Sequence, residues 1–178
     1  VRTAAVQRDE HMLQPWMERM EPIILVGPEG CGKHMLLTKL FAAQRSTQVA
    51  VVHCSAQTLA AHVIHKLSSV CQMSQTQTGR VYRPRDAARV VLYLKDINLP
   101  KPDKYDTAEL VAFLQQIVTY QGFYDKNLDF VGLQNIQVRA ASPRAAPSPS
   151  PSPFTQHRPL AFALTLTLAL ALALALAL

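Results

Sequence analysis

The sequence predicts an α/β fold in which helices cover both faces of a parallel sheet, and two observations support this prediction. Short apolar runs alternate with amphipathic helical patterns along residues 1–141. Strands that alternate with helices in this way form parallel sheets, because each crossover helix has to pack on a face of the sheet. A glycine-rich segment also lies directly between the first apolar run and the first helical pattern. Together these features predict a three-layer domain.

Each element is expected from its own pattern. Apolar runs rich in β-forming residues predict strands at 22–27, 49–55 and 89–97, and the segment QNIQVRA (134–140) is a candidate fourth strand. Apolar residues at helical spacing predict helices at 33–44, 58–71 and 107–120. The segment GFYDKNLDFVG (122–132) predicts a small hairpin with Asn127 near its turn.

Composition divides the chain into three segments. Residues 1–141 have an ordinary globular composition, long enough for one domain with a hydrophobic core. Residues 142–159 are rich in Pro, Ser and Ala, and such a segment cannot bury a core, so we expect a disordered linker there. Residues 160–178 form a low-complexity apolar tail of Ala-Leu repeats.

The apolar tail has two interpretations. Ala and Leu favour a helix, and a helix over 160–178 would be about 30 Å long, which matches the apolar thickness of a bilayer. Contact with a membrane through this tail follows from that interpretation. A strict dipeptide repeat after a Ser-Pro repeat also has the pattern of translated repetitive nucleotide sequence, and this second interpretation is favoured.

Charge and cysteine content argue against a nucleic-acid-binding protein and against a disulfide-stabilised protein. The net charge is +6, but the basic residues are scattered. The densest group contains Arg80, Arg83, Arg85 and Arg89 and predicts a solvated face, so no nucleic-acid partner is expected. Three cysteines with no CxxC pair argue against a disulfide framework.

The glycine-rich segment matches a phosphate-binding loop. Gly27, Gly32 and Lys33 fit the pattern G-x-x-x-x-G-K in the required context, after a predicted strand and before a predicted helix. The loop amides and the positive end of the helix can cradle a phosphate chain, and the lysine adds a positive charge for the β- and γ-phosphates. We therefore expect a P-loop NTPase fold that binds ATP or ADP through Gly27, Pro28, Glu29, Gly30, Cys31, Gly32, Lys33 and His34.

His34 stands where a Ser or Thr hydroxyl usually ligates Mg²⁺ in such loops. An imidazole prefers softer metals and is a poor replacement at an ion that takes oxygen ligands. We expect His34 to be a spectator at the start of the helix, and any Mg²⁺ to be held weakly.

The strand VVLYLKDINLP (90–100) departs from the usual pattern in a second way. A P-loop ATPase of the AAA+ type usually ends this strand in two acids, of which the first holds the metal and the second activates water. Here Lys95 and Asp96 stand at the end of the strand. In one register Asp96 is the metal acid, and in the other Lys95 replaces the metal acid and Asp96 is a shortened base.

Several longer segments resemble the third AAA+ module of dynein heavy chains. They are KDINLP (95–100), DKYDT (103–107), VAFLQQIVTYQGFYD (111–125) and VGLQNIQV (131–138). The segments ILVGPEGCGK, VHCSAQT and TGRVYRP are most similar to the heavy chain of the cytoplasmic dynein of intraflagellar transport. The resemblance covers the chain from about Gln7 to Val138.

The resemblance implies both a register and a function. Because this strand typically reads DEINLP in dyneins, Lys95 lies at the metal-acid position, which leaves no protein ligand for a metal, and Asp96 lies at the catalytic-base position. The implied function is an ATP-binding module of a minus-end-directed microtubule motor of the cytoplasm, cytoskeleton and ciliary axoneme. The implied partners are neighbouring AAA+ modules, intermediate and light chains, and microtubules. We expect the nucleotide to be structural or regulatory, with weak or no hydrolysis.

The resemblance stops before the family pattern is complete. The last strand of the sheet and the helical lid of an AAA+ module have no counterpart in the sequence after Val138, so we expect an incomplete module that supplies half of a nucleotide site. One alternative is an interaction or membrane-anchored fragment with a vestigial nucleotide site. A second, less favoured alternative is a P-loop kinase for a small molecule, which would need a lid carrying arginines.

Overall fold

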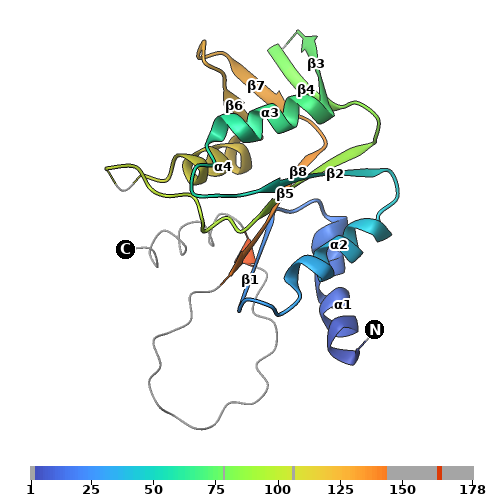
Figure 1. The fold of residues 1–178 in the computed structure, drawn as a ribbon. Helices are drawn as coiled ribbons and strands as arrows, with labels where there is room; N and C mark the ends of the chain where they lie inside the picture. The colour runs from blue at the N-terminus through green and yellow to red at the C-terminus, as the bar shows by residue number, and fades with distance from the viewer. Residues whose placement is uncertain (1–2, 78, 106, 144–163, 166–178) are drawn as a thin grey trace.

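A five-stranded sheet and a separate four-stranded sheet form the framework of the computed structural model, which describes residues 3–77, 79–105, 107–143 and 164–165 (Figure 1). The five-stranded sheet has the order β2-β5-β8-β1-β9. Its strands are β1 (Ile23–Gly27), β2 (Thr47–His53), β5 (Arg89–Lys95), β8 (Ile136–Pro143) and β9 (Leu164–Thr165). The helices are α1 (Ala4–Glu18), α2 (Lys33–Ala43), α3 (Ala60–Val70) and α4 (Glu109–Tyr120).

The predicted α/β fold with a parallel sheet is confirmed. Strands β2, β5, β8 and β1 pair in parallel, and they correspond to the four predicted strands. Helices α2, α3 and α4 correspond to the three predicted helices. The register aligns Lys95 of β5 with Ala141 of β8, and Ala141 with Leu25 of β1. The carboxyl ends of these strands therefore meet at one edge of the sheet.

The sheet lies between two layers of helices, with α1 and α2 on one face and α3 and α4 on the other (Figure 1). Along β5 the side chains alternate between the two layers. Val90, Leu92 and Leu94 belong to the cluster with α3 and α4, and Val91 and Tyr93 belong to the cluster with α1 and α2. All five are buried. Burial on both faces explains why β5 reads as a continuous apolar run.

Helix α1 is absent from the sequence-based predictions. It buries Asp9, Leu13 and Met17, and Trp16 packs against the same cluster, as expected for a tryptophan that precedes the first strand. Pro15 lies inside the helix, where it removes a backbone hydrogen bond. An acid on the buried face and an internal proline hide the helical pattern.

The second sheet contains one predicted hairpin and one that was not predicted. Its order is β3-β4-β7-β6, formed by β3 (Cys71–Thr76), β4 (Gly79–Pro84), β6 (Gly122–Tyr124) and β7 (Phe130–Leu133). Strands β6 and β7 are antiparallel and confirm the predicted hairpin around Asn127. The hairpin β3-β4 was missed because its first strand, CQMSQT, is mostly polar.

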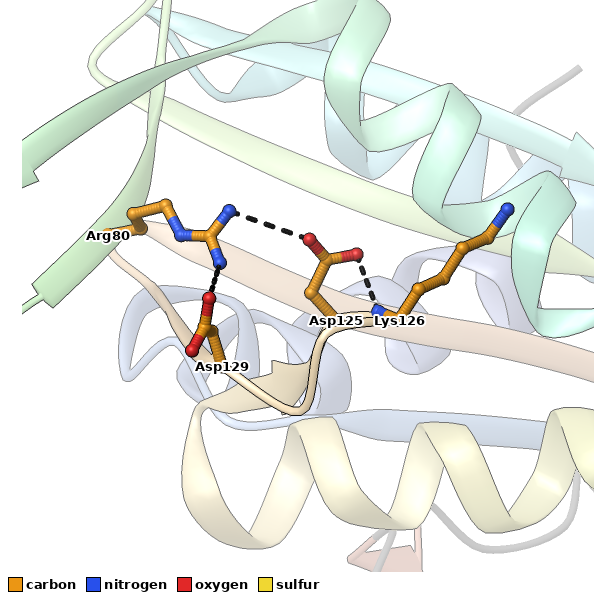
Figure 2. Close-up of polar contacts among 4 residues, drawn as sticks. All are labelled: Arg80, Asp125, Lys126 and Asp129. Carbon is orange, nitrogen blue, oxygen red and sulfur yellow. Dashed lines mark hydrogen bonds and ion pairs between the residues drawn. The ribbon is translucent and has the colours of Figure 1, made fainter.

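Arg80 connects the two hairpins of the second sheet (Figure 2). Its Nη1 lies 3.5 Å from Oδ2 of Asp125, and its Nη2 lies 2.5 Å from Oδ2 of Asp129, at the two ends of the β6-β7 turn. Arg83 donates through Nε to Gln134. Two members of the basic group at 80–89 thus have partners within the fold.

The predicted segments at the carboxyl end differ from the structure where it describes them. Strand β8 runs to Pro143, two residues into the predicted linker. Leu164–Thr165 form β9, antiparallel to Ile23–Ile24, so the predicted helix at 160–178 is wrong at these two positions. The rest of both segments lies outside the described residues. Within the described residues, no helix is both long and apolar enough to cross a bilayer.

Two buried thiols predict a loss of stability in alkaline solution. Burial raises the pKa of Cys54 and of Cys71 from 9.0 to about 11, while the unfolded chain keeps ordinary thiols. Between pH 9 and 11 the unfolded state therefore binds fewer protons than the folded state, so stability falls as pH rises. We expect a loss of roughly 1 kcal/mol for each thiol by pH 10, measured by urea unfolding at pH 8, 9 and 10.

Cysteine substitutions separate the contribution of the two thiols from other causes of lost stability at high pH. Cys54→Ala and Cys71→Ala are each expected to flatten the dependence on pH, because each removes one group that titrates differently in the two states. Cys31, which is only half-buried, supplies the matched control, Cys31→Ala. An equal slope in all four proteins would contradict the prediction.

Candidate nucleotide-phosphate site

The glycine-rich loop has the backbone conformation that a phosphate cradle needs. It joins the end of β1 at Gly27 to the start of α2 at Lys33. Gly30 and Gly32 have φ of +75° and +84°, in the left-handed region where a side chain is strained. No described atom lies within 4 Å of a Cβ built at either glycine, so the backbone conformation, and not lack of space, requires glycine there.

The first turn of α2 keeps its backbone donors available. Gly32 is the N-cap residue, and no described side chain caps the helix. The carbonyl of Gly32 accepts from the amide of Leu36 at 3.0 Å, which fixes the first turn. Uncapped amides at the start of a helix, with the positive end of its dipole, attract an anion.

Lys33 lies folded across the loop. Its ammonium donates to the carbonyl of Gly27 at 2.8 Å and to the carbonyl of Pro28 at 2.7 Å, and it lies 3.7 Å from Sγ of Cys31. These contacts hold the positive charge beside the amides of the same loop. Glu29 and Pro28 are exposed at the tip of the loop. A phosphate chain that enters the loop would meet the ammonium and can take over its hydrogen bonds.

His34 has a structural partner that the sequence does not indicate. Its ring stacks on Tyr93 of β5, with centroids 5.7 Å apart and an interplanar angle of 9°. Nδ1 lies 3.3 Å from the tyrosine hydroxyl. Phe41 packs edge-on against Tyr93, with ring centroids 5.5 Å apart. The expected spectator at the helix start is therefore tied to the strand beneath it.

Tyr93 keeps its proton in this cluster. It is 1% exposed, and burial, with a smaller contribution from the charge of Asp96, raises its pKa from 10.0 to about 12. The hydroxyl stays neutral at physiological pH, and Nδ1 of His34 is engaged by it. The sequence analysis did not single out Tyr93, although it is the aromatic residue within the aliphatic run of β5 and this position could have marked it.

Lys95 and Asp96 lie at the carboxyl edge of the sheet, where β8 separates their strand, β5, from β1, the strand that leads into the loop. Lys95 ends β5, and its carbonyl accepts from the amide of Cys54 at 3.0 Å. Asp96 has φ of +58° and begins the turn that follows, in which its carbonyl accepts from Leu99 at 3.1 Å. The charge of Asp96 acts on both Cys54 and Tyr93. Asp and Asn tolerate this backbone region better than most residues.

The donor set at this edge does not fit Mg²⁺. The ion requires near-octahedral oxygen coordination, but His34 offers nitrogen, one of whose ring positions is already engaged, and Lys95 offers a cation. Within the described ranges, no group of three or more His, Cys, Asp or Glu residues could hold a metal ion. Nδ1 of His62, at the start of α3, is already engaged, because it accepts a hydrogen bond from the amide of Leu59 at 3.0 Å. Asp96 by itself is a poor metal site.

The fold and the loop define a P-loop nucleotide-binding domain of the three-layer α/β class. A family model described as the P-loop containing dynein motor region matches residues 1–153. The chain belongs to this dynein motor family. The match extends beyond both limits inferred from the sequence, Gln7 and Val138, and it includes helix α1 and the end of β8.

Several dynein heavy chains are similar to this chain. It is 59% identical over 143 residues to cytoplasmic dynein 2 heavy chain 1 of Homo sapiens and 50% identical over 137 residues to that of Chlamydomonas reinhardtii. These alignments cover 79% and 76% of this chain and 3% of each relative. A cytoplasmic dynein heavy chain of Caenorhabditis elegans is 33% identical over 150 residues, which are 83% of this chain and 3% of the relative. The chain thus spans about 3% of the length of these relatives.

Proposed function

We propose that this chain is the nucleotide-holding part of the third AAA+ module of a ciliary dynein heavy chain. The observation that carries the proposal is the position of Lys33, whose ammonium lies across a glycine loop between β1 and α2. Membership in the dynein motor family and the identity to cytoplasmic dynein 2 heavy chains support the same function. Bound ATP or ADP would stabilise or regulate the motor, with weak or no hydrolysis.

The partners follow from the architecture of the family. A nucleotide site of an AAA+ ring lies between neighbouring modules, so the next module would contribute the other half of this site. Through the complete motor, the chain would act with dynein intermediate and light chains on microtubules. The place of action would be the cytoplasm, the cytoskeleton and the ciliary axoneme, in transport towards microtubule minus ends.

Binding of nucleotide tests the proposal. Lys33→Ala in the 178-residue chain is expected to weaken ATP and ADP binding about 10- to 100-fold, because hydrogen bonds from a charged group are worth about 1.5–3 kcal/mol. Lys101→Ala, at an exposed loop position, serves as the matched control and should bind as the unmodified chain does. Titration calorimetry with each nucleotide provides the measurement. Equal affinity in all three proteins would favour an interaction fragment with a vestigial site.

A further inference from the structure

We propose that this site binds nucleotide in the absence of Mg²⁺, and that Lys95 supplies the positive charge that the metal supplies in other P-loop sites. The inference rests on the proposed function, because it concerns how the same loop holds a phosphate chain. It starts from the observation that His34, Lys95 and Asp96 do not offer the set of oxygen ligands that Mg²⁺ requires.

The side chain of Lys95 leaves the sheet on the face that carries the loop and α2. Tyr93 lies two residues earlier on β5, points into the layer with α2, and contacts His34 in the first turn of that helix. Side chains two residues apart on a strand leave the same face, about 6.6 Å apart. Lys95 is therefore one step nearer than Tyr93 to the carboxyl edge, and it is level with Leu25, two residues before Gly27.

The ammonium of Lys95 has no anionic partner within the described part of the chain. The residue is half-buried, and the ion pairs there are formed by Arg8, Lys39 and Arg80. Asp96 follows Lys95 directly, but its left-handed backbone takes it into the next turn, where it acts on Cys54 and Tyr93. A partly buried cation without a partner is unfavourable, and a phosphate oxygen is a suitable partner for it.

The same charge disfavours a metal at this edge. A divalent cation would be repelled by Lys95, and Asp96 offers the one carboxylate among residues 94–98 at the end of β5. The stack on Tyr93 and the 3.3 Å contact of Nδ1 hold His34 against β5. The phosphate charge would then be balanced by Lys33, Lys95 and the loop amides.

Binding with and without metal tests the inference. The 178-residue chain is titrated with ATP and with ADP, first in excess EDTA and then in excess Mg²⁺. Affinities that agree within about threefold are expected for the unmodified chain. Lys95→Met removes the charge and is expected to weaken binding in EDTA about tenfold, without rescue by Mg²⁺. Lys95→Asp should weaken binding in EDTA at least as much, and Mg²⁺ should then restore it.

The control is Lys101→Asp, which makes the same change of charge at an exposed loop residue and should show no dependence on Mg²⁺. Thermal melting verifies that each variant is folded. The inference is overturned if the unmodified chain binds tenfold or more tightly with Mg²⁺ than in EDTA, or if Lys95→Met binds as tightly as the unmodified chain in EDTA. Failure of the proposed function gives a different result, namely no difference between the unmodified chain and Lys33→Ala in either solution.

Discussion

A complete dynein ring that carries residues 1–143 of this chain, with its other nucleotide sites disabled, is expected to release phosphate far more slowly than about 1 per second, a typical enzyme rate. Transfer of the γ-phosphoryl group needs a well-placed Mg²⁺ and an oriented water. On the proposed assignment, Lys95 takes the metal-acid position, and Asp96 takes the base position with a side chain about one methylene shorter than the usual glutamate. Misplacement of about 1 Å can cost about a hundredfold in rate, and the loss of the metal acid should cost at least as much again.

Restoring the usual residues should reverse this loss. Lys95→Asp with Asp96→Glu is expected to raise phosphate release at least tenfold, and His34→Thr should add to the gain. The structure adds Tyr93→Phe to this set, because His34→Thr would leave the buried tyrosine hydroxyl without its 3.3 Å partner. Lys101→Asp in the same ring is the matched control for the change of charge.

Two outcomes would contradict the prediction for hydrolysis. One is turnover near 1 per second in the ring with the unmodified segment. The other is a fully restored variant that folds but is no faster, which would locate the limit elsewhere in the ring. Folding has to be measured, because position 96 has φ of +58° and glutamate tolerates this backbone less well than aspartate.

The sequence predicted the parallel sheet and the loop because both depend on local patterns. Each of β1, β2 and β5 contains a short apolar run, and burial between two layers of helices requires such runs. The loop was found because its glycines adopt positive φ between a strand and a helix, which is a local requirement of the backbone.

The contacts around the loop could not be predicted, because they join distant parts of the chain. His34 and Tyr93 are 59 residues apart, and only the packing of α2 on β5 brings their rings together. The partners of Arg80 are 45 and 49 residues away. Helix α1 was missed for another reason, since Asp9 lies on its buried face and Pro15 interrupts its pattern.

Arg139 is a fully buried cation that the sequence analysis did not single out. It lies in the middle of β8, between Tyr93 and Ile23, and it is 0% exposed. Nη2 donates to Oε1 of Gln137 at 3.0 Å. Among the described residues, Nε and Nη1 of Arg139 and Nε2 of Gln137 have no hydrogen-bond partner. Burial lowers the pKa of this guanidinium from its ordinary value to about 10, so it stays charged at neutral pH.

Replacing Arg139 by methionine is expected to stabilise the chain. A buried charge without full pairing costs several kcal/mol, and well-packed apolar replacements of buried ionic groups are often stabilising by about 1–4 kcal/mol. Methionine is unbranched and adapts to irregular spaces, so it suits the site of an arginine stem. Urea unfolding at pH 7 should show the higher free energy of unfolding. Thermal melting should show a rise in Tm of roughly 2 °C or more.

The control variants identify the cause of that gain. Arg139→Lys keeps a charge at the same buried position and should give no increase, and Arg45→Met, on the exposed surface, should change stability by less than about 0.5 kcal/mol. Adding Gln137→Leu to Arg139→Met should stabilise further. In the single variant the buried amide oxygen of Gln137 has lost the guanidinium that donated to it, and the second substitution removes that amide. If Arg139→Met instead destabilises the chain by more than about 1 kcal/mol, the guanidinium has partners that satisfy its charge in solution, and β8 is held by them.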